Sequence, residues 1–260
     1  MTTSSLPPAD PAWPPDGGRH DAGDPDEAFP VPFGMLDGFG LILWSLVAIV
    51  LISAVAAASG VDFDDQNVLL WLTLSIQTVV TGGALVWLKL RNALSWRLLG
   101  PVRPRWRHVF IGLGIGVVGL MLFLAVATIV NDVFGPFPDP DQSLLATAEA
   151  GSFAIALLVV GSVIGAPLSE ELIFRSVMFQ ATRRRFGVVA GLVVSSLLWA
   201  YVHTTALGAP QALFGLVALG LWLAGAFHRT GSLVVPLVGH ATYNALVVTV
   251  QVLGPSPTPT

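Results

Sequence analysis

The sequence contains no cysteine and few charged residues. Without cysteine, neither disulfide bonds nor thiolate metal sites can form. Charged residues make up only 11% of the chain, whereas a typical soluble domain has about 25%. Hydrophobic residues make up 54% of the 260 residues, and long apolar runs recur over most of the sequence. These values exclude an ordinary soluble globule. They predict an integral membrane protein whose surroundings are a lipid bilayer and whose partners do not include nucleic acid.

Seven apolar runs approach the length of about 20 residues that a helix needs to cross a bilayer. They span residues 39–59, 68–88, 109–130, 152–167, 188–203, 211–227 and 233–253. The fourth run is short, but a second helical piece at 168–182 follows its proline, so a kinked crossing or a helix pair is expected at 152–185. The predicted fold class is all-α, a polytopic transmembrane bundle of about seven to eight helices.

The first 37 residues differ in composition from the rest of the chain. They are rich in proline, aspartate and glycine, which is typical of disordered segments. We therefore predict a disordered acidic tail at 1–37, an integral membrane domain at 38–253 and a short C-terminal tail at 254–260.

Lysine and arginine are distributed unevenly among the loops. All but one of the 12 lie in the N-terminal tail or in the loops after the second, fourth and sixth runs, and the alternate loops contain none. Because cytoplasmic loops collect positive residues, this pattern predicts a cytoplasmic N-terminus and an external C-terminus. The predicted location is the cell membrane.

Glu170, Glu171 and Arg175 are the full charges expected at membrane depth. Ionisable groups there are costly and are functional candidates by default. Glu171 and Arg175 are four residues apart, so they face each other on a helix and are predicted to form a structural ion pair. Glu170 is rotated from its neighbour by about 100° on an α-helix. We expect it to have a different partner and a chemical role.

Polar residues of two later runs are expected at a similar depth. His203 lies near the outer end of the fifth run, and His240 and Asn244 lie in the seventh run on one helix face. A hydrogen bond to a neighbouring helix would explain either histidine alone. Together with Glu170, these residues supply a base, two imidazoles and an amide, which are the parts of a hydrolytic site. We predict that the four converge on a wet pocket in the outer half of the membrane.

Three short motifs follow one another on successive predicted helices. They are Glu170-Glu171-x-x-x-Arg175, Trp199-x-x-x-His203 and His240-x-x-x-Asn244. This ordered set resembles the motifs of the CPBP family of intramembrane proteases, which includes CAAX prenyl endopeptidases and bacteriocin-immunity relatives. The segments "LLGPVRPR" and "FHRTGSLVVPLVGHATYN" are also similar to connecting segments of the family, and the resemblance covers about residues 96–250. The family usually has phenylalanine where Trp199 stands.

The resemblance implies endopeptidase activity on a peptide or membrane-protein substrate. It assigns water activation to Glu170, and to His203 it assigns sharing of the proton or holding of the water. It assigns stabilisation of the oxyanion to His240 and Asn244. The paired Glu171 and Arg175 would orient their helix. The oligomeric state is not specified by these motifs.

Two alternatives remain for the cofactor, a zinc ion or none. Glu170, His203 and His240 suit a zinc ion bound by two imidazoles and a carboxylate, with an open position for water. The same residues suit metal-free catalysis by the glutamate. The sequence contains no His-Glu-x-x-His motif that would separate the base from the ligands. For this reason we favour no cofactor over zinc.

Two other function classes compete with the protease. A noncatalytic immunity or scaffold protein would have little reason to keep Glu170 beside an ion pair that is already balanced. A transporter usually has two related halves with broken helices, and the sequence shows no such internal repeat. The order of preference is therefore protease, immunity or scaffold protein, and transporter.

Overall fold

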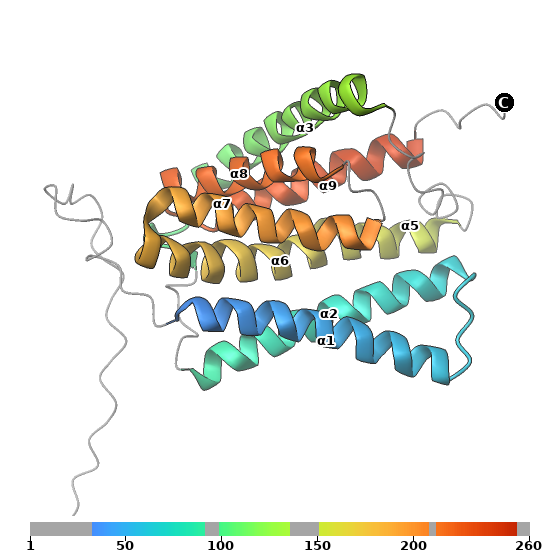
Figure 1. The fold of residues 1–260 in the computed structure, drawn as a ribbon. Coiled ribbons are helices and arrows are strands. Elements are labelled where there is room, and N and C mark those ends of the chain that lie inside the picture. The colour runs from blue at the N-terminus through green and yellow to red at the C-terminus, as the bar shows by residue number, and fades with distance from the viewer. Residues whose placement is uncertain (1–32, 92–98, 136–150, 208–211, 254–260) are drawn as a thin grey trace, which may run out of the picture. The chain divides into compact units, whose positions relative to one another are not determined.

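The computed structural model describes residues 33–91, 99–135, 151–207 and 212–253 (Figure 1). Within these ranges every regular element is helical, so the predicted all-α class is confirmed. The elements are α1 (Met35–Ala58), α2 (Gln66–Leu90), α3 (Trp106–Phe134), α5 (Ser152–Val159), η2 (Val160–Gly165), α6 (Ala166–Glu170), η3 (Glu171–Phe179), α7 (Gln180–Leu207), α8 (Ala212–Thr230) and α9 (Val234–Leu253). The segments η2 and η3 are π-helical.

The described helices have the length and composition of membrane spans. Five helical stretches qualify by length and hydropathy, with 152–203 counted as one of them, and 234–250 is a shorter apolar helix. Apolar side chains can face lipid without cost, and many lie on the surface of α1, α2 and α3. The chain is a multi-pass membrane protein. Most of the predicted tail and all of residues 254–260 lie outside the described residues.

The stretch from α5 to α7 makes two crossings joined by a glycine turn. From Ser152, the elements α5, η2, α6 and η3 follow one another directly and lead into the first turns of α7. Gly187 interrupts α7 with φ 86° and ψ 171°, a conformation that favours glycine. After this turn the chain runs back beside α6 (Figure 1). The predicted kinked crossing and the following predicted span therefore form an antiparallel pair.

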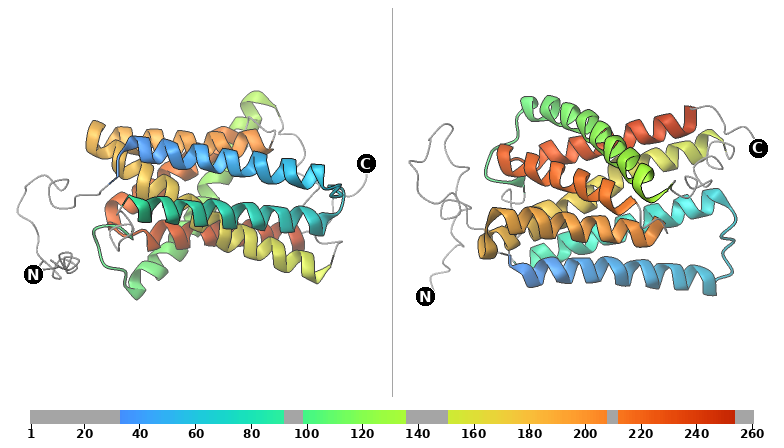
Figure 2. Two further views of the ribbon diagram at one scale, coloured as in Figure 1. Left: turned by 90° about the horizontal axis from the view of Figure 1, so that it is seen from below. Right: turned by 45° about the horizontal axis from the view of Figure 1, so that its top comes forward.

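Other helices pack closely around this antiparallel pair of crossings. In the two views of Figure 2, α1 lies beside α2, and α3 packs against α8 and α9. On α3, a Cβ atom at Gly112 would lie 2.6 Å from Cβ of Val238, and one at Gly116 would lie 2.5 Å from the Gly239 oxygen. Small residues allow membrane helices to approach this closely. This close contact with α3 fixes the position of α9, which carries part of the predicted site.

The first helix begins before the predicted domain boundary at residue 38. Helix α1 starts at Met35, and Asp37 lies buried in its first turn. The Asp37 carboxylate accepts hydrogen bonds from the Gly34 amide (2.8 Å), Trp87 Nε1 (3.1 Å) and Arg91 Nε (3.1 Å). Asp37 therefore belongs to the helical bundle, whereas its sequence neighbourhood had placed it at the end of the tail.

Candidate functional site

The structure brings together Glu170, His203 and His240 from three different helical crossings. Glu170 ends α6, His203 lies near the end of α7, and His240 lies in α9. The Glu170 Oε2 atom is 3.3 Å from His203 Nε2 and 3.8 Å from His240 Nε2. Two imidazole nitrogens thus point at the same carboxylate oxygen.

Trp199 adds a third contact to that oxygen. Its indole Nε1 donates a hydrogen bond to Glu170 Oε2. The Trp199 side chain is buried, and its ring centroid lies 4.5 Å from that of His203 and 5.5 Å from that of His240. The sequence motif associated Trp199 with His203 but gave it no contact with the glutamate. A phenylalanine in this place would have no N–H group to donate.

The hydrogen bonds of His203 define its tautomer. Its Nδ1 lies 2.8 Å from the backbone oxygen of Trp199. A carbonyl oxygen only accepts hydrogen bonds, so Nδ1 carries the hydrogen and neutral His203 presents an unprotonated Nε2 to Glu170. A proton shared between His203 Nε2 and the carboxylate would turn this contact into a hydrogen bond.

His240 is held by both neighbouring glutamates. Its Nδ1 lies 2.9 Å from Glu171 Oε1, while its Nε2 faces Glu170. The carboxylate of Glu171 accepts, so Nδ1 carries a hydrogen in this ring as well. Glu170 and Glu171 therefore have different main partners, His203 and Arg175, and they share one imidazole, whose opposite nitrogens they contact.

Glu171 and Arg175 form an ion pair in the protein interior. Arg175 Nη1 lies 2.9 Å from Glu171 Oε1, and both side chains are 0% exposed. The other terminal nitrogen of Arg175 donates to the Gly220 oxygen of α8 at 3.5 Å, and its guanidinium lies 4.8 Å from the Trp199 ring centroid. Arg175 thereby connects η3 to α7 and α8 beside the two histidines.

Asn244 lies one helical turn beyond His240 but makes a different contact. Its amide Nδ2 donates to the backbone oxygen of Ser162 in η2 at 2.7 Å. Among the described residues, no hydrogen bond connects Asn244 with Glu170. The structure therefore places Asn244 against the segment that precedes α6, and its oxyanion role stays a prediction.

The Glu170 carboxylate is only partly enclosed. Its side chain is 19% exposed and that of His203 is 27% exposed, whereas His240 is 3% exposed. The contacts with Trp199 and the two histidines all involve Oε2. Within the described part of the chain, Oε1 has no hydrogen-bonding partner. One carboxylate oxygen thus makes all the contacts of this side chain with the described residues.

Comparison with known proteins supports the resemblance given by the motifs. Residues 152–246 match the sequence family described as type II CAAX prenyl endopeptidase Rce1-like. This match confirms the family resemblance. The matched segment contains all six predicted site residues and is narrower than the resemblance over 96–250. Helices α1, α2 and α3 lie outside this Rce1-like segment.

A bacterial protein is similar over part of the same chain. The "Putative membrane peptidase YdiL" of Bacillus subtilis (strain 168) is 30% identical over 98 residues, which are 38% of this chain. The match also spans only 38% of the length of that relative. No solved structure matches the chain.

The residues around Glu170 include the donor types of a metal site. The donor types of Glu170, His203 and His240 are those that zinc uses in hydrolases. As the side chains stand in the described ranges, no three His, Cys, Asp or Glu residues form a group that could hold a metal ion. The donor chemistry of these three residues fits zinc. The zinc alternative stays a prediction for a chelator experiment.

Proposed function

We propose that this chain is an intramembrane endopeptidase that hydrolyses a peptide bond of a peptide or membrane-protein substrate. The observation that supports this proposal is the convergence of two imidazole Nε2 atoms on the carboxylate of Glu170, at 3.3 and 3.8 Å. A balanced structural ion pair needs no such arrangement. The Rce1-like match of residues 152–246 supports the same reaction class.

Glu170 is the proposed general base. Trp199 holds its Oε2 atom, so Oε1 is oriented to take a proton from a water molecule that attacks the scissile carbonyl. Positioning of this kind lowers the entropic cost of bringing water and substrate together. Glu170 then gives this proton to the leaving amine, and a proton on Oε2 instead would be shared with His203 Nε2, which lies 3.3 Å from that oxygen.

His240 is the proposed electrophile. When this ring is doubly protonated, Nδ1 donates to Glu171 and Nε2 has a hydrogen that can be donated to the carbonyl oxygen of the substrate. Glu171 fixes the orientation of the ring through Nδ1, as a buried carboxylate does for the histidine of hydrolytic triads. Asn244 would then support the oxyanion only if its amide leaves the Ser162 oxygen.

The orientation in the membrane is part of the proposal. The distribution of arginine and lysine favours a cytoplasmic N-terminus and an external C-terminus in the cell membrane. His203 lies near the end of α7 that this orientation places outside. Water would therefore enter the site from the external side.

A cleavage assay with purified protein tests the proposed role of Glu170. Quenched fluorescent peptides and a membrane-protein reporter serve as substrates for the full chain in detergent. Glu170→Gln preserves the shape of the side chain but removes the base, so cleavage should fall by at least about 100-fold. The matched control is Asp64→Asn, which removes a carboxylate from an exposed residue before α2 and should cleave normally.

The same assay separates the alternatives. Cleavage by Glu170→Gln at the normal rate would refute the role of this residue. Loss of wild-type activity with a chelator, restored by added zinc, would favour the metal-dependent mechanism. Folded wild-type protein that cleaves none of the substrates would favour the noncatalytic immunity or scaffold alternative.

A further inference from the structure

The π-helical segment η2 contains a carbonyl oxygen for which its own helix has no regular donor. In a π-helix each N–H bonds to the carbonyl oxygen five residues before it, and the N–H of Ala166 bonds to the Gly161 oxygen in this way. The next N–H in this register would bond to the Ser162 oxygen. It would belong to Pro167, and proline has no N–H. The Ser162 oxygen therefore needs a donor from another part of the chain.

The side chain of Asn244 supplies this donor from helix α9. Its Nδ2 donates to the Ser162 oxygen at 2.7 Å. At membrane depth such a donor matters, because lipid cannot satisfy a backbone carbonyl. In the alternative α-helical register, the N–H of Ala166 would bond to this same oxygen, four residues before it. The two registers therefore compete for one atom, and the Asn244 bond favours the π-helical one.

Helix α2 contacts the same segment through two of its glycines. A Cβ atom at Gly165 would overlap the side-chain oxygen of Gln77, and a Cβ atom at Gly161 would lie 3.6 Å from that oxygen. The segment η2 is thus held by close packing on α2 and by the Asn244 bond from α9.

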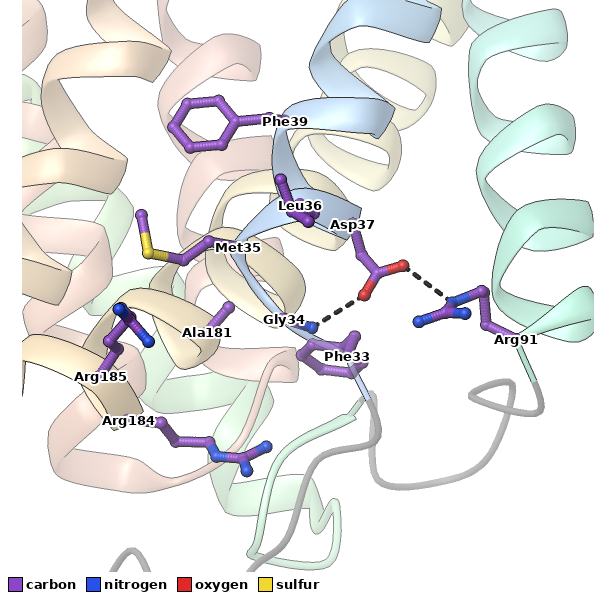
Figure 3. Close-up of a pocket in the computed structure, with 10 residues that line it drawn as sticks. All are labelled: Phe33, Gly34, Met35, Leu36, Asp37, Phe39, Arg91, Ala181, Arg184 and Arg185. Carbon is purple, nitrogen blue, oxygen red and sulfur yellow. Dashed lines mark hydrogen bonds and ion pairs between the residues drawn. The ribbon is translucent and has the colours of Figure 1, made fainter.

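The crossing is also held on the far side of Glu170. A Cβ atom at Gly38 of α1 would lie 2.8 Å from Cε of Met178, so α1 packs directly on η3. Figure 3 shows the turns that follow, where Ala181 and the start of α1 line one pocket. Between η2 and η3 lies only the five-residue helix α6, and Glu170 is its last residue. A change of register in η2 therefore acts on the part of the crossing that carries Glu170.

We propose that Asn244 is a positioning residue, which holds Glu170 in place by donating to the oxygen that Pro167 leaves without a donor. A one-residue change of register would turn α6 by about 100° and would carry the carboxylate away from Trp199 Nε1. A misplacement of about 1 Å can cost about 100-fold in rate. The effect of Asn244 on cleavage rests on the proposed function, whereas its effect on the position of Glu170 does not.

Fluorine NMR of the full chain in detergent tests the position of Glu170 without substrate. The eight tryptophans are replaced by 5-fluorotryptophan, and the Trp199 signal is identified by its loss in Trp199→Phe. Glu170→Ala gives the position of this signal when the indole has lost its acceptor. In Asn244→Leu the signal should move most of the way to that position. The matched control is Thr242→Val, which removes a hydroxyl that bonds within α9 and should leave the signal in place.

The cleavage assay separates positioning from direct contact with the substrate. Asn244→Leu should lower kcat by about 30-fold or more, but the loss of an oxyanion donor would have a similar effect. Pro167→Ala restores a main-chain N–H in register with the Ser162 oxygen. When Pro167→Ala is already present, adding Asn244→Leu should therefore lower kcat by less than about threefold.

Two results would overturn the proposal. One is an unmoved Trp199 signal in Asn244→Leu, with Asn244→Ala as a smaller second variant and circular dichroism to verify that both are folded. The other is an equal loss of kcat from Asn244→Leu with and without Pro167→Ala, which would assign the amide to the substrate. If wild type cleaves no substrate, the proposed function fails and the fluorine result alone decides the positioning role.

Discussion

Replacing Arg175 by methionine should strongly destabilise the helical bundle. Methionine keeps much of the volume and apolar character of the side chain but removes its charge. Glu171 would then lose the guanidinium at 2.9 Å and keep only His240 Nδ1 at the same distance. Because Glu171 is 0% exposed, water cannot replace the lost partner.

The expected magnitude follows from the cost of an unpaired buried charge. Removing one partner of a buried ion pair costs about 3–5 kcal/mol. For a chain of this size, each kcal/mol lowers the midpoint of thermal unfolding by about 2–4 °C. Arg175→Met should therefore unfold about 6–20 °C below wild type. The loss of the Gly220 contact adds to this effect.

The assay is thermal unfolding of the purified protein in detergent, followed by circular dichroism. A matched double variant, Glu171→Gln/Arg175→Met, removes both charges and should recover at least half of the lost stability. An unfolding midpoint of Arg175→Met within about 2 °C of wild type would refute the reasoning. Equal midpoints for the single and double variants would show that the loss does not come from an isolated carboxylate.

Two further substitutions test other contacts. Trp199→Phe keeps an aromatic ring but removes the N–H donated to Glu170, so kcat should fall about tenfold in the cleavage assay; an unchanged kcat would show that the indole does not orient the carboxylate. Gly38→Leu should lower the free energy of unfolding by about 1–3 kcal/mol, because its side chain would overlap Met178. The matched control, Gly114→Leu on α3, has open space around its Cβ and should unfold like wild type.

Much of the fold could be predicted from the sequence because lipid imposes a simple rule. A crossing helix needs a long apolar run, and such runs are visible without knowledge of their partners. The proline at 167 and the arginines at 183–185 also predicted one net crossing between residues 152 and 185. The start of α1 was placed too late, because the acid at position 37 was assigned to the tail although it accepts hydrogen bonds at the start of the helix.

The individual contacts of the site could not be predicted from the spacing of residues along the sequence. Helical periodicity indicated different partners for Glu170 and Glu171, but it could not show that His240 lies between the two carboxylates. The contact between Trp199 and Glu170 joins residues of two antiparallel crossings. It depends on how far the two crossings are shifted along each other. The bond from Asn244 to a backbone oxygen had no sequence signal, since every residue presents the same backbone carbonyl group.

The turn at Gly187 also determines how the two crossings that it joins are aligned along their length. Each residue inserted between this glycine and Trp199 would advance the indole by about 1.5 Å and swing it by about 100° around the helix axis. A single insertion there would turn the indole and the imidazole of His203 away from the carboxylate, although hydropathy and charge would hardly change. The geometry of the site thus constrains the number of residues between Gly187 and Trp199 as well as their identity.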